Sequence, residues 1–313
     1  MSSSDGEEEE SKDTIIPLEN VYSLVQDSQS LEPLLWQQFY DRLEWFGEIP
    51  IVSSGASGLV IVALHGAGGS SMTFAIIAKL LRENYHFFSF DFGCHGINRK
   101  TDEEKLDVDS LVNEALSVLN YIRQQNPDSK IIIIGHSMGG AIASKAALLY
   151  QAQGYKVSGI ILIDMVEGRA FEAFSNNEAR INRMPKSFDL IKDAVLWSLE
   201  SQVLKNVESA RISIPSQLIE INGKWEWKVD LLKTRKFWEG WFSGMNGACL
   251  AVDAPKLLIM SNSDRLDDQM TYAWHQGKIK HRIINYVGHW IHEDSPIKFV
   301  EELDRFFSMF KFK

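Results

Sequence analysis

Six runs of apolar residues recur along the chain, most of them next to glycine or charged residues. They occupy residues 59–66, 86–93, 130–137, 159–168, 256–264 and 281–289. Apolar runs without alternating polar positions are typical of parallel strands that are buried on both faces. Stretches with helical periodicity lie between them, as at 111–122 and 299–307. This alternation predicts an α/β fold with a mostly parallel central sheet flanked by helices.

Two segments depart from the alternation. Apolar residues between Leu34 and Phe46 recur with a helix-like period up to Pro50, which predicts a short helix packed on the domain. Between about 170 and 253, helical patterns and aromatic residues dominate, and no run resembles a buried strand. We therefore expect a single domain over 15–313, with a helical cap inserted at about 170–253.

Composition and charge narrow the class of protein. The first 14 residues are acidic, rich in serine and almost free of apolar side chains, which predicts a disordered tail. The net charge of -10 over 313 residues argues against nucleic acid as a partner. We expect no membrane association, because no apolar stretch approaches the roughly 20 residues of a membrane span and the N-terminus lacks a signal-peptide pattern. Only two cysteines are present, which favours a reducing compartment, cytoplasmic or nuclear.

The clearest chemical signal is the sequence G-x-S-x-G at residues 135–139, which stands between an apolar run and a helix-forming stretch. A strand, this motif and a helix together form a nucleophile elbow, in which small neighbours tolerate a strained turn that lifts the serine hydroxyl above the sheet. The N–H groups at the start of the helix favour developing negative charge. We predict that Ser137 is a nucleophile and that the motif is more than a glycine-rich turn.

A serine nucleophile needs a base, and His289 follows the last apolar run. Serine first and histidine last is the chain order of α/β hydrolases. His289 and His292 have the spacing H-x-x-H, which can indicate a metal pair. We expect no metal there, because His289 has a better role as the base and the following acidic pair is typical of the start of a helix.

Two aspartates can complete the triad on spacing alone. Asp264 ends the run at 256–264, and Asp164 lies in the run at 159–168. The base needs one carboxylate to fix its tautomer and to stabilise the imidazolium. The residues by themselves leave this choice open.

An oxyanion hole is predicted from the loop after the first run. Residues 65–69 read HGAGG, which is similar to the HGGG loop of esterases. The backbone N–H groups of Ala67 and Met138 are then the expected donors. The loop lacks the lysine and the spacing of a phosphate-binding P-loop, which argues against nucleotide binding.

Longer motifs resemble one family in particular. GHSMGGAIA, IDMVEG, NVESARIS, FWEGWF, DRLD and GHWIHEDSP look like the protein phosphatase methylesterases, and the similarity runs from about Trp36 to the end. These α/β hydrolases remove the methyl ester from the C-terminal leucine of the phosphatase 2A catalytic subunit. The resemblance implies an α/β-hydrolase fold, catalytic roles for Ser137, Asp164 and His289, no cofactor, and the methylated phosphatase tail as partner of a protein that is monomeric when free.

Some features of the cap and loops bear on this resemblance. Arg211, Trp238 and Trp241 are the expected partner contacts in the cap, because arginine and tryptophan dominate binding hot spots. The long acidic insertion of the family is replaced by a short link. Gly93 stands where the family motif D-x-R-x-H-G has arginine, and Ala67 replaces a glycine.

Two other functions are compatible with these residues. A small-molecule esterase, amidase or C–C hydrolase would use the same triad on a different substrate. A non-catalytic partner would bind and hold an inactive phosphatase with the triad idle.

Overall fold

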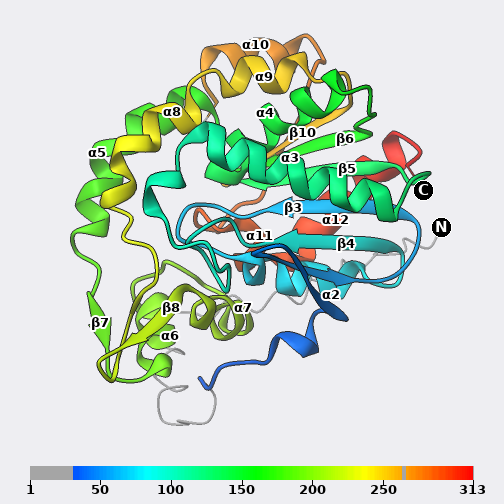
Figure 1. Ribbon diagram of the computed structural model, residues 1–313. Coiled ribbons are helices and arrows are strands. Elements are labelled where there is room, and N and C mark those ends of the chain that lie inside the picture. The colour runs from blue at the N-terminus through cyan, green and yellow to red at the C-terminus, as the bar shows by residue number, and fades with distance from the viewer. Residues whose placement is uncertain (1–30, 263–265, 313) are drawn as a thin grey trace, which may run out of the picture.

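The computed structural model describes residues 31–262 and 266–312. The acidic tail, the start of the predicted domain at residue 15 and Asp264 therefore lie outside the described residues. The centre of the structure is an eight-stranded sheet with the strand order β1-β2-β4-β3-β5-β6-β10-β11 (Figure 1). Its strands are β1 (Arg42–Phe46), β2 (Ile49–Ser54), β3 (Leu59–Leu64), β4 (Tyr85–Phe90), β5 (Ile131–His136), β6 (Gly159–Ile163), β10 (Lys256–Met260) and β11 (Lys280–Ile283).

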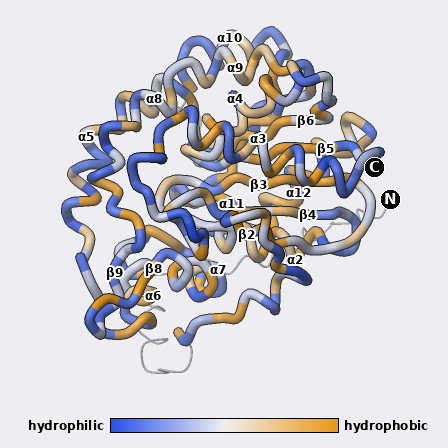
Figure 2. Tube along the Cα trace, in the orientation of Figure 1, coloured by the Kyte–Doolittle hydropathy of each residue, from blue (hydrophilic) through white to orange (hydrophobic). Residues whose placement is uncertain are grey.

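The mostly parallel sheet predicted from the apolar runs is confirmed. The six runs coincide with six strands, namely β3, β4, β5, β6, β10 and β11. Neighbours among these strands pair in parallel. Alternate residues of β3 belong to different cores: Val60 and Val62 pack on one face of the sheet, whereas Ile61 and Ala63 pack on the other. Burial on both faces explains why the runs lack alternating polar positions. In Figure 2, β3, β5 and β6 are coloured as hydrophobic segments.

Helices cover both faces of the sheet. The first core contains α3 (Val108–Gln125), α4 (Met138–Ala152) and α9 (Met245–Ala251), and the second contains α2 (Ala75–Leu81) and α12 (Pro296–Met309). The remaining helical segments outside the cap are η1 (Trp36–Gln38), η2 (Ser71–Phe74), η3 (Glu103–Lys105), α10 (Asp268–His275) and α11 (Ile291–Asp294). Over the described ranges, no helix is long and apolar enough to cross a membrane.

The predicted helix between Leu34 and Phe46 is wrong. This segment contains the single turn η1 followed by β1, which pairs with β2 in antiparallel register. The turn between the two strands contains Gly47 at φ 61°, a left-handed conformation that glycine adopts readily. Pro50 belongs to β2, although proline is rare within a sheet. Pairing with neighbouring strands has overridden the local periodicity here.

A segment between β6 and β10 corresponds to the expected cap, and its elements α5, α6, β7 and β8 lie on the left in Figure 1. It contains α5 (Glu167–Ile181), β7 (Ser187–Phe188), α6 (Ile191–Glu200), α7 (Val207–Ser213), η4 (Pro215–Gln217), β8 (Leu218–Ile221), β9 (Lys224–Trp227), η5 (Lys233–Phe237) and α8 (Trp238–Phe242), followed by α9.

The sequence predicted a helical cap, but this segment is not purely helical. It also contains a three-stranded antiparallel sheet with the order β7-β9-β8. Its strands are short and mostly exposed, so they lack the apolar runs of the central sheet. Asn222 and Gly223 join β8 to β9, and both have positive φ, as a two-residue Asn-Gly hairpin turn requires.

The cap residues predicted to contact a partner are buried or half-buried in this structure. Trp238 and Trp241 are only 5% and 2% exposed. The indole N–H of Trp241 donates to the Leu106 carbonyl at 2.6 Å, so this side chain fastens the cap to the body of the domain. Arg211 is half-buried, and its Nε donates to the Glu32 carbonyl at 2.8 Å. We therefore assign the two tryptophans to the core that the cap shares with the central sheet and its helices, and Arg211 to anchoring the N-terminal segment.

Glu293 on α11 is a buried carboxyl group in this fold. In the described part of the chain, neither of its oxygens has a hydrogen-bond partner of good geometry. Burial raises the pKa of Glu293 well above its usual range, while the nearby Ser213 hydroxyl counteracts part of this shift and Asp294 adds to it. The carboxyl group is therefore protonated in the folded protein over a wide pH range.

We expect Glu293→Gln to remove a pH dependence of stability. Because the pKa is raised on folding, the stabilising contribution is complete below the unfolded pKa and is lost as pH rises through the folded pKa. The free energy of unfolding of the wild type should fall by up to about 1.4 kcal/mol per pH unit relative to the variant above about pH 5. Urea unfolding from pH 5 to 9 measures this difference, and parallel curves for the two proteins would contradict it. Asp294 is present in both the wild type and the variant, so its own contribution to the pH dependence cancels in the difference.

Candidate active site

The predicted site residues follow strands that are neighbours in the sheet. The loop 65–69 follows β3, Ser137 follows β5 and Asp164 follows β6, while His289 comes after β11. Since β3, β5, β6, β10 and β11 are parallel neighbours in that order, their carboxyl ends meet at one edge of the sheet. Residues more than 200 positions apart in the sequence are brought together in this way.

Ser137 stands on a strained turn between β5 and α4. Its backbone has φ 52° and ψ -120°, a conformation that costs energy for any residue with a side chain. Its N–H donates to the Ile163 carbonyl at 3.1 Å, which ties the turn to β6. A Cβ at Gly139 would lie 2.3 Å from the Leu64 carbonyl oxygen, and one at Gly135 would lie 2.3 Å from the Gly139 oxygen. The two glycines of the motif are therefore required by close backbone packing.

Asp164 and His289 form a direct hydrogen bond. His289 Nδ1 lies 2.8 Å from Asp164 Oδ2, and the Asp164 side chain is fully buried. The other carboxylate oxygen accepts from the backbone N–H and the hydroxyl of Ser261, at 3.0 and 2.8 Å. This arrangement favours Asp164 as the partner of the histidine. Ser261, immediately after β10, was not identified from the sequence and holds the carboxylate in place.

The backbone of His289 is held by His136, the residue before Ser137. His136 Nε2 donates to the His289 carbonyl oxygen at 2.9 Å. Burial, followed by the nearby His289 and His292, lowers the pKa of His136 well below its usual range, so the ring is neutral. Gly66 leaves room for this ring, since a Cβ there would lie 2.8 Å from His136 Nδ1. His136 occupies a variable position of the G-x-S-x-G motif, so this role could not be predicted from the motif.

The serine and the histidine are not yet joined. In the described part of the chain, no hydrogen bond links the Ser137 hydroxyl to His289. The Ser137 residue is half-buried, and the His289 side chain is 26% exposed. Contacts between a nucleophile and its base are often long in the free enzyme and tighten when substrate binds.

His65 fixes the start of the predicted oxyanion loop. Its Nδ1 donates to the Gly66 carbonyl at 2.8 Å, and its Nε2 accepts from the Phe92 N–H at 3.0 Å. Burial lowers the pKa of His65 to about 4, so the ring is neutral at physiological pH. Only the neutral ring can donate through one nitrogen and accept through the other.

His95 supports the same loop from the segment after β4. Its Nδ1 donates to the Gly93 carbonyl at 2.8 Å, and its Nε2 accepts from the Gly68 N–H at 3.1 Å. Burial, with the nearby His65 as a second cause, lowers the pKa of His95 to about 3. Two neutral histidines thus orient the backbone on both sides of Ala67. Neither was singled out in the sequence.

The two predicted oxyanion donors have free N–H groups. Among residues 31–262 and 266–312, no group accepts a hydrogen bond from the backbone N–H of Ala67 or Met138. Met138 is the first residue of α4, where N–H groups have no partner within the helix. Leu231 of the cap lies over Gly68, 3.3 Å from the position a Cβ would take there. Both N–H groups are thus available to a ligand oxygen.

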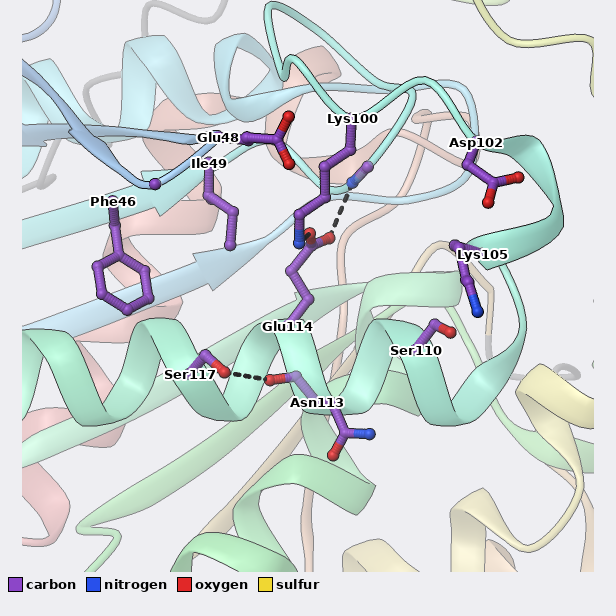
Figure 3. Close-up of a pocket in the computed structure, with 12 residues that line it drawn as sticks. Phe46, Glu48, Ile49, Lys100, Asp102, Lys105, Ser110, Asn113, Glu114 and Ser117 are labelled. Atoms are coloured by element: carbon purple, nitrogen blue, oxygen red, sulfur yellow. Dashed lines mark hydrogen bonds and ion pairs between the residues drawn. The ribbon is translucent and has the colours of Figure 1, made fainter.

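Beside Gly93, at the position where the family motif D-x-R-x-H-G has arginine, a lysine forms an ion pair with a buried carboxylate. Glu114 on α3 is 7% exposed, and its two oxygens accept from the Gly93 N–H at 2.8 Å and from Lys100 Nζ at 2.6 Å (Figure 3). With no side chain at Gly93, a cavity of about 650 Å³ lies beside this ion pair and extends to Phe46. Lys100, from the segment that follows His95, therefore supplies the positive charge that pairs with the buried carboxylate of Glu114 on α3.

His292, the second histidine of the H-x-x-H pair, is packed in the core. Within the described ranges, no group of three or more histidine, cysteine, aspartate or glutamate side chains could hold a metal ion. The ring of His292 is buried and stacks on Phe74 with the centroids 4.5 Å apart. Burial and the nearby His289 lower its pKa to about 3, so it is a neutral core residue.

Comparisons with known proteins agree with this geometry. Residues 61–303 match the alpha/beta hydrolase family. The chain is 33% identical to a probable protein phosphatase methylesterase 1 of Caenorhabditis elegans, over 89% of this chain and 78% of the relative. It is 35% identical to protein phosphatase methylesterase 1 of Schizosaccharomyces pombe, over 77% and 72%. Among solved structures, E-2-(acetamidomethylene)succinate hydrolase shares the fold, with a TM-score of 0.70 at 18% identity over 85% of this chain and 98% of that one. The chain therefore belongs to the protein phosphatase methylesterase family of the α/β hydrolases and is a carboxylic ester hydrolase.

Proposed function

We propose that this protein removes the methyl ester from the C-terminal leucine of the phosphatase 2A catalytic subunit. The observation that carries the proposal is the 2.8 Å hydrogen bond between His289 Nδ1 and Asp164 Oδ2, at the sheet edge that also holds the strained Ser137 turn. Relatives at 33% and 35% identity bear the name of this activity. The folded phosphatase is thus the proposed partner, and its methylated tail is the substrate.

In the proposed reaction, Ser137 attacks the leucyl carbonyl carbon while His289 Nε2 takes the hydroxyl proton. Asp164, which stays ionised, stabilises the imidazolium that forms and holds Nδ1 as the protonated nitrogen. His289 then gives the proton to the departing methoxide oxygen, so methanol leaves and an acyl-enzyme remains. Water attacks this ester with His289 again as the base, which releases the leucine carboxylate and restores Ser137.

Negative charge develops on the carbonyl oxygen in both halves of the reaction. The N–H groups of Ala67 and Met138 are the proposed donors, because neither has an acceptor in the described structure. Loss of one such donor typically lowers turnover by about 10² to 10³. His65 and His95 support this role indirectly, since they fix the backbone on either side of Ala67. No cofactor takes part in any step.

We expect Ser137→Ala to abolish both demethylation and labelling by a fluorophosphonate probe. The variant loses the attacking oxygen, and comparable triads lose about 10⁶ in turnover when the serine is removed. Methanol release from methylated phosphatase measures the first effect, and mass spectrometry of the labelled peptide measures the second. Circular dichroism should show an unchanged fold. Demethylation that persists in this variant would refute the mechanism, and turnover of short esters alone by the wild type would favour a small-molecule hydrolase.

We expect Asp164→Asn and Asp264→Asn to behave differently. The Asp164 change should lower kcat by about 10⁴, because an amide does not hold the histidine in the required tautomer. Asp264, which lies outside the described residues, serves as the matched control and should retain most of the activity. Steady-state kinetics of both variants on methylated phosphatase test this assignment. An active Asp164 variant together with an inactive Asp264 variant would transfer the role to Asp264.

A further inference from the structure

Asp294 is a fully buried carboxyl group five residues after His289 that plays no part in the proposed chemistry. Its Oδ2 accepts a hydrogen bond from the Gly288 N–H at 2.6 Å. Its Oδ1 accepts from the Lys205 N–H, in the cap, at 2.8 Å. One carboxylate therefore joins the Val287–Gly288 peptide bond, one residue before His289, to the segment that precedes α7.

Asp294 restrains the backbone on the N-terminal side of His289, which the contacts of His289 with Asp164 and His136 leave free. Asp164 holds the imidazole, and His136 holds the carbonyl oxygen of His289. Asp294 holds the N–H of the preceding Gly288. Backbone restraint on both sides of His289 sets the direction in which Nε2 points, because the side chain leaves the chain between these two anchors.

The link to the cap has further contacts. Lys205 Nζ donates to the Tyr286 carbonyl at 2.9 Å, within the loop that leads to His289. The Ser209 hydroxyl on α7 donates to the Glu293 carbonyl at 2.7 Å in a buried position. Tyr286 itself has φ 66° and is 83% exposed, so its side chain adds little packing to this loop. Hydrogen bonds from the cap thus provide much of what orders the loop before the histidine.

We infer that Asp294 is a positioning residue for catalysis, which sets His289 relative to Ser137 and makes that setting depend on the cap segment at Lys205. The inference rests on the proposed function, because it requires His289 to be the base. A carboxylate suits this position since it accepts two N–H groups from two directions. An asparagine of the same size offers one acceptor, and its own N–H₂ would face the other N–H donor.

The test compares Asp294→Asn with Glu293→Gln. Both changes replace a buried carboxyl with its amide on the same short helix, but only Asp294 accepts from Gly288. Turnover of p-nitrophenyl acetate and the labelling rate of Ser137 by a fluorophosphonate are measured for both variants, wild type and Ser137→Ala. We expect Asp294→Asn to lower kcat and the labelling rate by about 10 to 100-fold with KM nearly unchanged, since misplacement by about 1 Å can cost 10²-fold. Glu293→Gln should retain wild-type rates.

A second variant keeps the test decisive if Asp294→Asn folds poorly. A Cβ at Gly288 would lie 3.2 Å from Asp294 Oδ2, so Gly288→Ala disturbs the same contact while the carboxylate remains. Its kcat should fall at an unchanged melting temperature, and its effect should not add to that of Asp294→Asn in a double-mutant cycle.

The outcomes separate the two proposals. Equal rates for wild type and Ser137→Ala would refute the proposed function itself. If the wild type is active and its activity depends on Ser137, three results would overturn the positioning role alone. The first is a folded Asp294→Asn variant with unchanged kcat, and the second is an equal loss of activity in the Asp294 and Glu293 variants. The third is full additivity of the effects of the Gly288 and Asp294 changes.

Discussion

The close approach of the first turn of α4 to the end of β3 is the constraint on which the site depends. Gly139 leaves no room for a side chain beside the Leu64 carbonyl, so helix and strand meet backbone to backbone. This contact forces Ser137 into its strained conformation. The same turn lies against the loop 65–69, since a Cβ at Gly66 would lie 3.2 Å from Ser137 Cβ. The proposed nucleophile and oxyanion donors thus share one region of close backbone packing, and the hydrogen bond of Ser137 to Ile163 ties the turn to β6.

The central sheet could be predicted from the sequence because burial on both faces leaves a continuous apolar run. The dependence of this signal on burial also explains why the strands β1, β8 and β9 were not predicted. β1 is only half-buried, and the strands of the cap hairpin are mostly exposed, so their positions carried no such signal. The Asn222-Gly223 pair is a local signal for that hairpin, but the strands beside it lack an apolar run. Pairing partners that are distant in the sequence decided the fold of these segments.

The site could be predicted only in part, since motifs reveal the groups that react and seldom those that hold them. Ser137 and His289 stand in recognisable contexts, whereas the choice of Asp164 needed family resemblance before its contact with His289 supported it. His65, His95 and His136 act through neutral rings whose tautomers depend on backbone groups in other segments. The cap tryptophans show the converse error, because residue type alone cannot tell a binding surface from a core.

The ion pair of Lys100 and Glu114 lies against Gly93, seven residues before the lysine in the sequence. Glu114 is buried and pairs with Lys100, and a Cβ at position 93 would lie 3.7 Å from Lys100 Cβ and 3.8 Å from Glu114 Oε2. A long side chain at position 93 would therefore compete with Lys100 for the space beside Glu114, and loss of Lys100 would leave a buried charge uncompensated.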